Sequence, residues 1–192
     1  MKKLLLAVFS ITTTFSLYAR REVPQERMEQ IYEEVKTPYK YGLAIAPADN
    51  HHKIDCPTVF RQGDKWLMTY VVYNGKSGTD GRGYETWIAE SDNLLEWRTL
   101  GRILSYRDGK WDCNQRGGFP ALPDMEWGGS YELQTYKGRH WMTYIGGEGT
   151  GYEAVKAPLY IGLASTKGDI STAHEWESLD KPILSIHDKD AQ

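Results

Sequence analysis

The sequence predicts an all-β protein made of β-propeller blades, about two four-stranded antiparallel blades of a probable five, with a short N-terminal helix. Three observations predict this fold. Short segments are rich in aromatic and β-branched residues, turn residues separate them, and the pattern repeats about 75 residues further along the chain. A sandwich or jelly roll made from the same strands is an open alternative.

The first predicted blade spans residues 54–104, and its four expected strands are 57–61, 66–73, 85–91 and 97–104. A tight turn at 62–65, Gln-Gly-Asp-Lys, joins the first two strands. A glycine-rich polar loop at 74–83 separates the second strand from the third. The stretch from Ile54 to Tyr73 is therefore predicted to be a hairpin with Asp55 just before its first strand.

The pattern recurs in residues 105–184, which we predict to be a second blade preceded by a long loop. Residues 137–144 echo 63–70, and the triplet Gly-Tyr-Glu at 83–85 recurs at 151–153. Further matches follow in the same order: 87–91 with 161–165, Glu96-Trp97 with Glu175-Trp176, and Ile103-Leu104 with Ile183-Leu184. Propellers typically have four to eight blades. Residues 185–192 are therefore expected to begin a third blade, and the chain to be the N-terminal portion of a longer protein.

Residues 1–19 have the features of a secretory signal peptide: two lysines, a short apolar run and a small residue at position 19. The apolar run is shorter than the roughly 20 residues that a membrane span needs. Residues 20–53 are predicted to hold a helix over 23–35 and an extended lead-in over 38–47. We expect an exported protein, periplasmic or secreted, with no membrane span in the mature chain.

Composition excludes several classes of function. The net charge is −3 with the basic residues scattered, so no nucleic-acid partner is expected. Seven Trp and thirteen Tyr suit either sugar faces or a β-rich core. Cys56 and Cys113 leave a disulfide open, and without a C-x-x-C or His/Cys pattern we expect no metal and no cofactor. Nothing in the sequence indicates an oligomeric state.

Blade geometry places several acidic residues at one end of the fold. The start of the first strand and the loop between the second and third strands lie at the same end of a blade. The acidic residues expected to converge there are Asp55, Asp112, Glu85, Glu153, Asp188 and Asp190. Carboxylates gathered at one end of a propeller make a candidate site for glycosidic bond hydrolysis.

Three motifs carry a family resemblance: Asp-x-Pro-x-Val-Phe at 55–60, the Gly-Asp-Lys-Trp turn at 63–66, and Ser-Asp-Asn-Leu-Leu-Glu-Trp at 91–97. Together they resemble the first blade of the five-bladed glycoside hydrolases of the arabinanase, levansucrase and invertase superfamily. The likeness spans roughly 54–184. It implies an exported glycoside hydrolase that cleaves a poly- or oligosaccharide by means of paired carboxylates.

The resemblance also implies roles for individual residues. Asp55 matches the aspartate that acts as general base or nucleophile, and Asp112 is the nearest match to a second acidic residue that orients the site. The general acid is usually a glutamate from the third blade, which this chain lacks, so the chain alone is expected to be inactive. Substrate contacts are expected from Trp111, Glu85, Glu153, Trp127 and His52.

Each candidate has a structural alternative. Asp55 caps a turn before Pro57 in one reading, and Asp112 forms an ion pair with Arg116 in another. Glu85 and Glu153 occupy the same position in the two repeats, which favours a structural role for both. At the level of the whole protein, the alternatives are a non-catalytic carbohydrate-binding propeller fragment and an inactive remnant.

Overall fold

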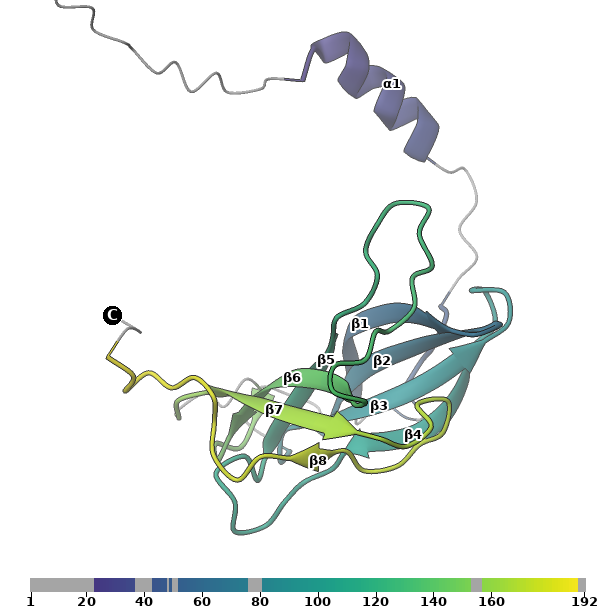
Figure 1. Ribbon diagram of the computed structural model, residues 1–192. Helices are drawn as coiled ribbons and strands as arrows, with labels where there is room; N and C mark the ends of the chain where they lie inside the picture. Colours follow the sequence, from purple (N-terminus) through teal and green to yellow (C-terminus); the bar gives the residue numbers. More distant parts are fainter. Residues whose placement is uncertain are drawn as a thin grey trace, which may run out of the picture. The chain divides into compact units, whose positions relative to one another are not determined.

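The computed structural model describes residues 23–36, 43–47, 49, 52–75, 81–152 and 157–189. The chain divides into two compact units, one within residues 1–40 and one within 41–192 (Figure 1). The predicted signal peptide lies outside the described residues. Within the described ranges, no helix has both the length and the apolar character needed to cross a membrane.

The first unit contains the predicted helix, α1 (Gln25–Val35). It begins two residues later than the pattern predicts, because Pro24 is still extended, with φ −55° and ψ 144°. It ends where Lys36 turns to extended backbone. The predicted lead-in at 38–47 is described only from residue 43, and residues 43–47 contain no strand.

In the second unit the described residues form eight strands: β1 (Lys53–Gln62), β2 (Lys65–Tyr73), β3 (Tyr84–Ser91), β4 (Arg98–Leu104), β5 (Gln115–Ala121), β6 (His140–Gly147), β7 (Tyr160–Thr166) and β8 (Glu177–Ser178). β1 to β4 pair antiparallel in sequence order, and β5 to β8 do the same. One parallel pair, Tyr84 with Gln115, links β3 to β5. The sheet is not closed, and the mostly β architecture with one short helix agrees with the prediction (Figure 1).

The two four-stranded groups share one register. Met68 of β2 lies opposite Ala89 of β3, and Met142 of β6 lies opposite Ala164 of β7. A tight turn with positive φ comes before the second strand of each group. It lies at Gly63 before β2 and at residues 137–138 before β6. The sequence repeat therefore corresponds to a repeated hairpin structure.

The main hydrophobic core lies between the two groups. Phe60, Leu67 and Ile88 of the first group pack in one cluster with Met142 and Tyr144 of the second. Met68, Tyr70 and Ala89 face a separate, smaller cluster. Because adjacent residues of a strand point to opposite faces, Leu67 and Met68 contribute to different clusters.

The first strand of the second group, β5, is absent from the sequence prediction. Its sequence, Gln-Arg-Gly-Gly-Phe-Pro-Ala, is poor in residues that favour strands. The structure shows why Gly118 stands there: a Cβ would lie 2.4 Å from Met142 Sδ and 2.9 Å from Leu104 Cδ1. A close approach between the two groups thus requires a residue that propensity rules disfavour.

Gly162 is a second position of close approach, and its replacement is a stability test. It pairs with Tyr144, and an added Cβ would lie 2.2 Å from Tyr144 Cζ. Tyr144 is buried in the core, so we expect Gly162→Ala to lower the free energy of unfolding by about 1–3 kcal/mol. Urea unfolding monitored by circular dichroism measures this loss.

The matched control is Gly117→Ala, also in a strand, where the nearest atom to the new Cβ is Val71 Cγ1 at 3.3 Å. It should cost less than about 1 kcal/mol, because one methyl group can shift by a few tenths of an ångström. Equal losses in the two variants would contradict the packing argument.

Candidate active site

Asp55 lies on a β-bulge. The pairing of β1 with β2 is regular up to Asp55 and resumes at Thr58, with the register shifted between them. Cys56, inside this bulge, has φ +52°, a left-handed conformation that non-glycine residues seldom adopt. Its backbone N–H donates a hydrogen bond to Asp55 Oδ1 at 2.7 Å. Bulges and strained backbone of this kind are common beside functional sites, where they redirect a side chain.

The Asp55 side chain lines a cavity of about 260 Å³ between the two groups of strands. We call it the Asp55 cavity. Tyr84 and Gln115 also line it, and its apolar wall consists of Val71, Phe119, Ile145 and Leu159. Among the described residues that form the wall, Asp55 is the one acidic side chain. A mostly apolar cavity with a few polar groups is typical of small-ligand sites.

Three tyrosines gather beside Asp55. The ring centroids of Tyr73, Tyr84 and Tyr152 lie 5.4–5.6 Å from one another. The Lys53 ammonium lies 5.8 Å from the Tyr73 centroid and 5.4 Å from that of Tyr152. The Tyr152 hydroxyl donates to Asp55 Oδ2 at 3.4 Å, so this aromatic group is joined directly to the carboxylate.

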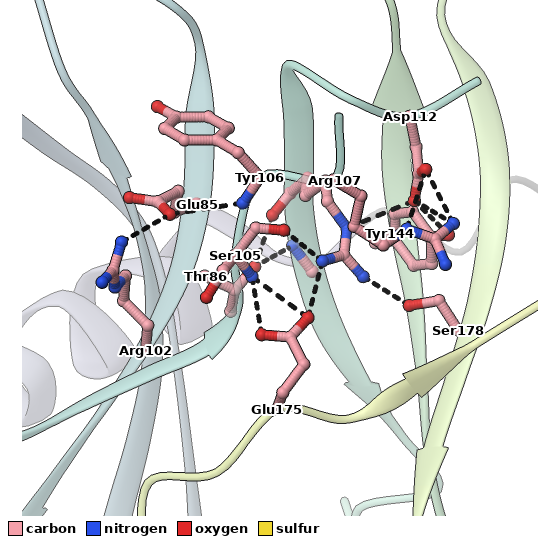
Figure 2. Close-up of polar contacts among 12 residues, drawn as sticks. Glu85, Thr86, Arg102, Ser105, Tyr106, Arg107, Asp112, Tyr144, Glu175 and Ser178 are labelled. Atoms are coloured by element: carbon pink, nitrogen blue, oxygen red, sulfur yellow. Dashed lines mark hydrogen bonds and ion pairs between the residues drawn. The ribbon is translucent and has the colours of Figure 1, made fainter. Parts of the chain in front are cut away.

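Asp112 is fully buried inside a polar network (Figure 2). Arg107 Nη2 lies 2.7 Å from Asp112 Oδ1 and 2.8 Å from Oδ2, Arg116 Nε lies 3.2 Å from Oδ2, and the Tyr144 hydroxyl donates to Oδ2 at 2.7 Å. The ion pair with Arg116, the structural alternative from the sequence, is therefore present. In this position the carboxylate is turned into the protein and does not line the Asp55 cavity.

The same network joins the two groups of strands. Arg116 is buried and forms an ion pair with Glu175 Oε1 at 2.6 Å, and it donates to the carbonyl of Ser105 and to the hydroxyl of Ser178. Burial, together with the hydrogen bond to Asp112, raises the pKa of Tyr144 to about 12. Tyr144 therefore stays a neutral donor throughout the physiological range.

Trp111 stacks on this network rather than on the Asp55 cavity. Its ring lies 5.8 Å from that of Tyr144 at an interplanar angle of 19°, and 6.2 Å from that of Tyr160. Gly146 makes room for it, since a Cβ there would lie 2.6 Å from Trp111 Cζ3. The predicted substrate contact is thus placed in a half-buried packing position.

Glu85 points away from the Asp55 cavity. It follows Tyr84, which lines the cavity, and successive strand residues face opposite sides. Its Oε1 accepts hydrogen bonds from Arg102 Nη1 at 3.0 Å and from the Tyr106 backbone N–H at 3.3 Å (Figure 2). Glu153, its counterpart in the repeat, lies outside the described residues, as does Asp190.

The other predicted site residues are dispersed. His52 contacts Asp49 Oδ1 through Nδ1 at 2.9 Å and lines a separate cavity of about 300 Å³ with Trp87. Trp127 is 97% exposed on the loop between β5 and β6. Asp188 accepts a hydrogen bond from the Ser185 backbone N–H at 2.6 Å. Among the predicted site residues that the structure describes, only Asp55 lines the Asp55 cavity.

The cysteines and metal ligands complete the inventory of reactive groups. Cys56 and Cys113 are not joined by a disulfide bond. Burial raises the pKa of the Cys113 thiol, which favours its protonated form. The described ranges contain no group of three or more His, Cys, Asp or Glu side chains that could hold a metal ion.

Sequence reasoning missed Tyr152 and Gln115. A sequence signal for Tyr152 was present in the repeated Gly-Tyr-Glu triplet. The two tyrosines of the triplet, Tyr84 and Tyr152, contact each other across the two groups of strands. The glutamates of the triplet were the predicted site residues instead. Gln115 carried no signal, since it begins the strand that propensity did not identify.

No protein-family profile matches this chain, and no curated protein matches it. Solved structures do match. One described as "Glycoside hydrolase" is 94% identical, with a TM-score of 0.84 over 89% of this chain and 49% of that protein. A second, a complex of BT0996 with RGII, matches with the same values. Zg3597, a family 117 glycoside hydrolase from Zobellia galactanivorans, has 11% identity and a TM-score of 0.48 over 68% of this chain and 38% of that one, a likeness too low to carry an argument.

The chain spans about half the length of the two near-identical solved proteins that it matches. The match with a solved glycoside hydrolase at 94% identity supports a glycoside hydrolase fold for this chain.

Proposed function

We propose that this chain is the front portion of an exported glycoside hydrolase with a five-bladed propeller fold, in which Asp55 is the general base or nucleophile. The observation that carries the proposal is the position of Asp55 in the wall of the cavity between the strand groups, held by the Cys56 N–H and the Tyr152 hydroxyl. The near-identical solved glycoside hydrolase supports the reaction class. The charged and apolar runs of residues 1–19 support export to the periplasm or beyond.

The proposed chemistry needs a second carboxyl group. Glycoside hydrolysis uses one ionised carboxylate and one protonated acid, about 5–5.5 Å apart for retention or about 6.5–9.5 Å apart for inversion. Asp112 does not supply the acid in this proposal, because its oxygens are taken up by Arg107, Arg116 and Tyr144. The acid would come from the half of the solved proteins that this chain does not cover.

The second near-identical structure, a complex with RGII, supports the choice of carbohydrate. We propose an RGII-derived oligosaccharide as the substrate. The test uses the protein extended to the full length of those solved relatives. This protein is incubated with RGII oligosaccharides, and the released sugar is followed by chromatography. Release of a defined sugar is the expected result, and no release from any RGII fragment would contradict this substrate.

A non-catalytic carbohydrate-binding role is the second candidate. It is favoured by one observation: a cavity with apolar and aromatic walls and a single carboxylate among its described lining residues. Such a binder would take up the oligosaccharide and release it unchanged. Calorimetric titration beside the cleavage assay separates the two candidates, because only the enzyme shortens the ligand.

A further inference from the structure

Gln115 is buried at the junction of the two strand groups. It is the first residue of β5, is 1% exposed, and lines the Asp55 cavity. Its Nε2 donates two hydrogen bonds of 2.8 Å, to the carbonyl oxygens of Gly149 and Gly151. Both acceptors belong to the loop that follows β6, so one amide group holds two points of that loop.

These two bonds determine the orientation of the amide. Only the NH₂ end can donate to carbonyl oxygens, so Oε1 must lie on the other side. Oε1 is buried and accepts no hydrogen bond from the part of the chain that the structure describes. A buried acceptor without a donor costs about 1–3 kcal/mol, which offsets much of what the two donated hydrogen bonds contribute to stability.

The loop that Gln115 holds also carries Tyr152, the hydrogen-bond partner of Asp55. Gly151 N–H donates to the Gly81 carbonyl at 3.2 Å, which ties the loop to the segment before β3. The next residue, Tyr152, places its ring against Tyr73 and Tyr84 and its hydroxyl 3.4 Å from Asp55 Oδ2. The contacts thus run without interruption from Gln115 through the loop to Asp55.

We propose that Gln115 is a positioning residue for the Asp55 cavity, which orients the Asp55 carboxylate by fixing residues 149–152. The inference rests on the proposed function, since Asp55 is the group that it positions. The position of the Tyr152 hydroxyl at Oδ2 depends on the backbone of Gly151 as well as on the ring contacts with Tyr73 and Tyr84. Releasing the loop therefore moves the hydrogen-bond donor of the carboxylate and part of the cavity wall.

Two substitutions of nearly the same size test this role. Gln115→Leu removes both hydrogen bonds, and we expect hydrogen exchange at Gly151 to accelerate and kcat/KM of the full-length protein to fall about 10- to 100-fold. Gln115→Glu places a carboxyl group against the two carbonyl oxygens. Its protonated form can donate to one of them, whereas its ionised form repels both.

We therefore expect loop protection and activity of the Gln115→Glu variant to depend on pH in a characteristic way. Burial disfavours the ionised form, so the pKa of the new carboxyl group would be raised above its ordinary value. Loop protection should then be greatest at low pH and be lost as the pH rises through that raised pKa, and the ratio of kcat/KM in Gln115→Glu to kcat/KM in the unsubstituted protein at the same pH should fall over the same range. The unsubstituted protein should not show this additional loss of loop protection with rising pH.

Thr86→Val is the matched control. Thr86 is also buried where the two groups meet, and its hydroxyl donates to the Arg116 carbonyl and accepts from the Gly118 N–H, both at 2.7 Å. None of the hydrogen bonds described for the Thr86 hydroxyl reaches residues 149–152. We expect a lower melting temperature with unchanged exchange at Gly151 and an unchanged pH profile.

The outcomes separate the positioning role from the proposed function. Unchanged exchange at Gly151 in Gln115→Leu overturns the role whatever the activity. Faster exchange with unchanged kcat/KM overturns it while the proposed function stands, provided that Asp55→Asn is inactive. Full activity of Asp55→Asn overturns the proposed function and the positioning role with it.

Discussion

Asp55→Asn should lower kcat/KM for oligosaccharide cleavage by about 10³-fold or more in the full-length protein, while binding of the oligosaccharide persists. The amide has nearly the same shape as the carboxylate and can still accept the hydrogen bond from the Cys56 N–H. It cannot act as a base or form a glycosyl–enzyme bond. The loss therefore reports the chemistry of the carboxylate rather than the shape of the cavity.

The assay compares single-turnover cleavage rates with calorimetric affinities for the same oligosaccharide. Asp64→Asn is the matched control, because Asp64 is an exposed aspartate in the turn at the other end of the same hairpin. It should leave both quantities unchanged. Cleavage by Asp55→Asn at the unsubstituted rate would remove Asp55 from the mechanism, and loss of affinity alone would favour the carbohydrate-binding role.

Asp112→Asn is expected to produce the largest loss of stability, about 3–5 kcal/mol in the free energy of unfolding. The change leaves Arg107 facing a neutral amide and leaves Arg116 with Glu175 as its one described carboxylate partner, in a site where Asp112 and Arg116 have no exposed surface. Uncompensated buried charge is far costlier than a lost surface pair. Because these contacts join the two strand groups, the loss should appear in the cooperative unfolding of the whole second unit.

Urea unfolding of the chain measures this loss, and Asp92→Asn is the control. Asp92 forms an ion pair with Lys65 at 2.6 Å, but its side chain is 78% exposed, so its loss should cost less than about 1 kcal/mol. Similar effects of the two substitutions would show that the buried network does not stabilise the junction. Absence of a cooperative transition in the unsubstituted chain would instead match the inactive-remnant alternative.

Local patterns predicted most of the secondary structure. The hairpins of β1–β2 and β6–β7, the glycine-containing turns and α1 lie within a few residues of their predicted positions. Alternating burial, turn residues and helical spacing are properties of neighbouring residues, so they can be read along the chain. β5 was not predicted because its composition is unlike that of a strand. Gly118 is needed there to make room for Met142 and Leu104, which are distant in sequence.

The candidate site was only partly predictable. The sequence alone determined that Asp55 lies near the start of the first hairpin and that a matched unit follows it. The prediction that Asp55 precedes the first strand was wrong, because β1 begins at Lys53 and already pairs with β2 at Asp55. Only the tertiary structure decided which acidic residues reach the cavity. Asp112 and Glu85 are turned to arginines, whereas Tyr152 and Gln115 are brought to Asp55. The physical reason is that the cavity exists only where the two groups of strands pack together, through contacts that no local pattern encodes.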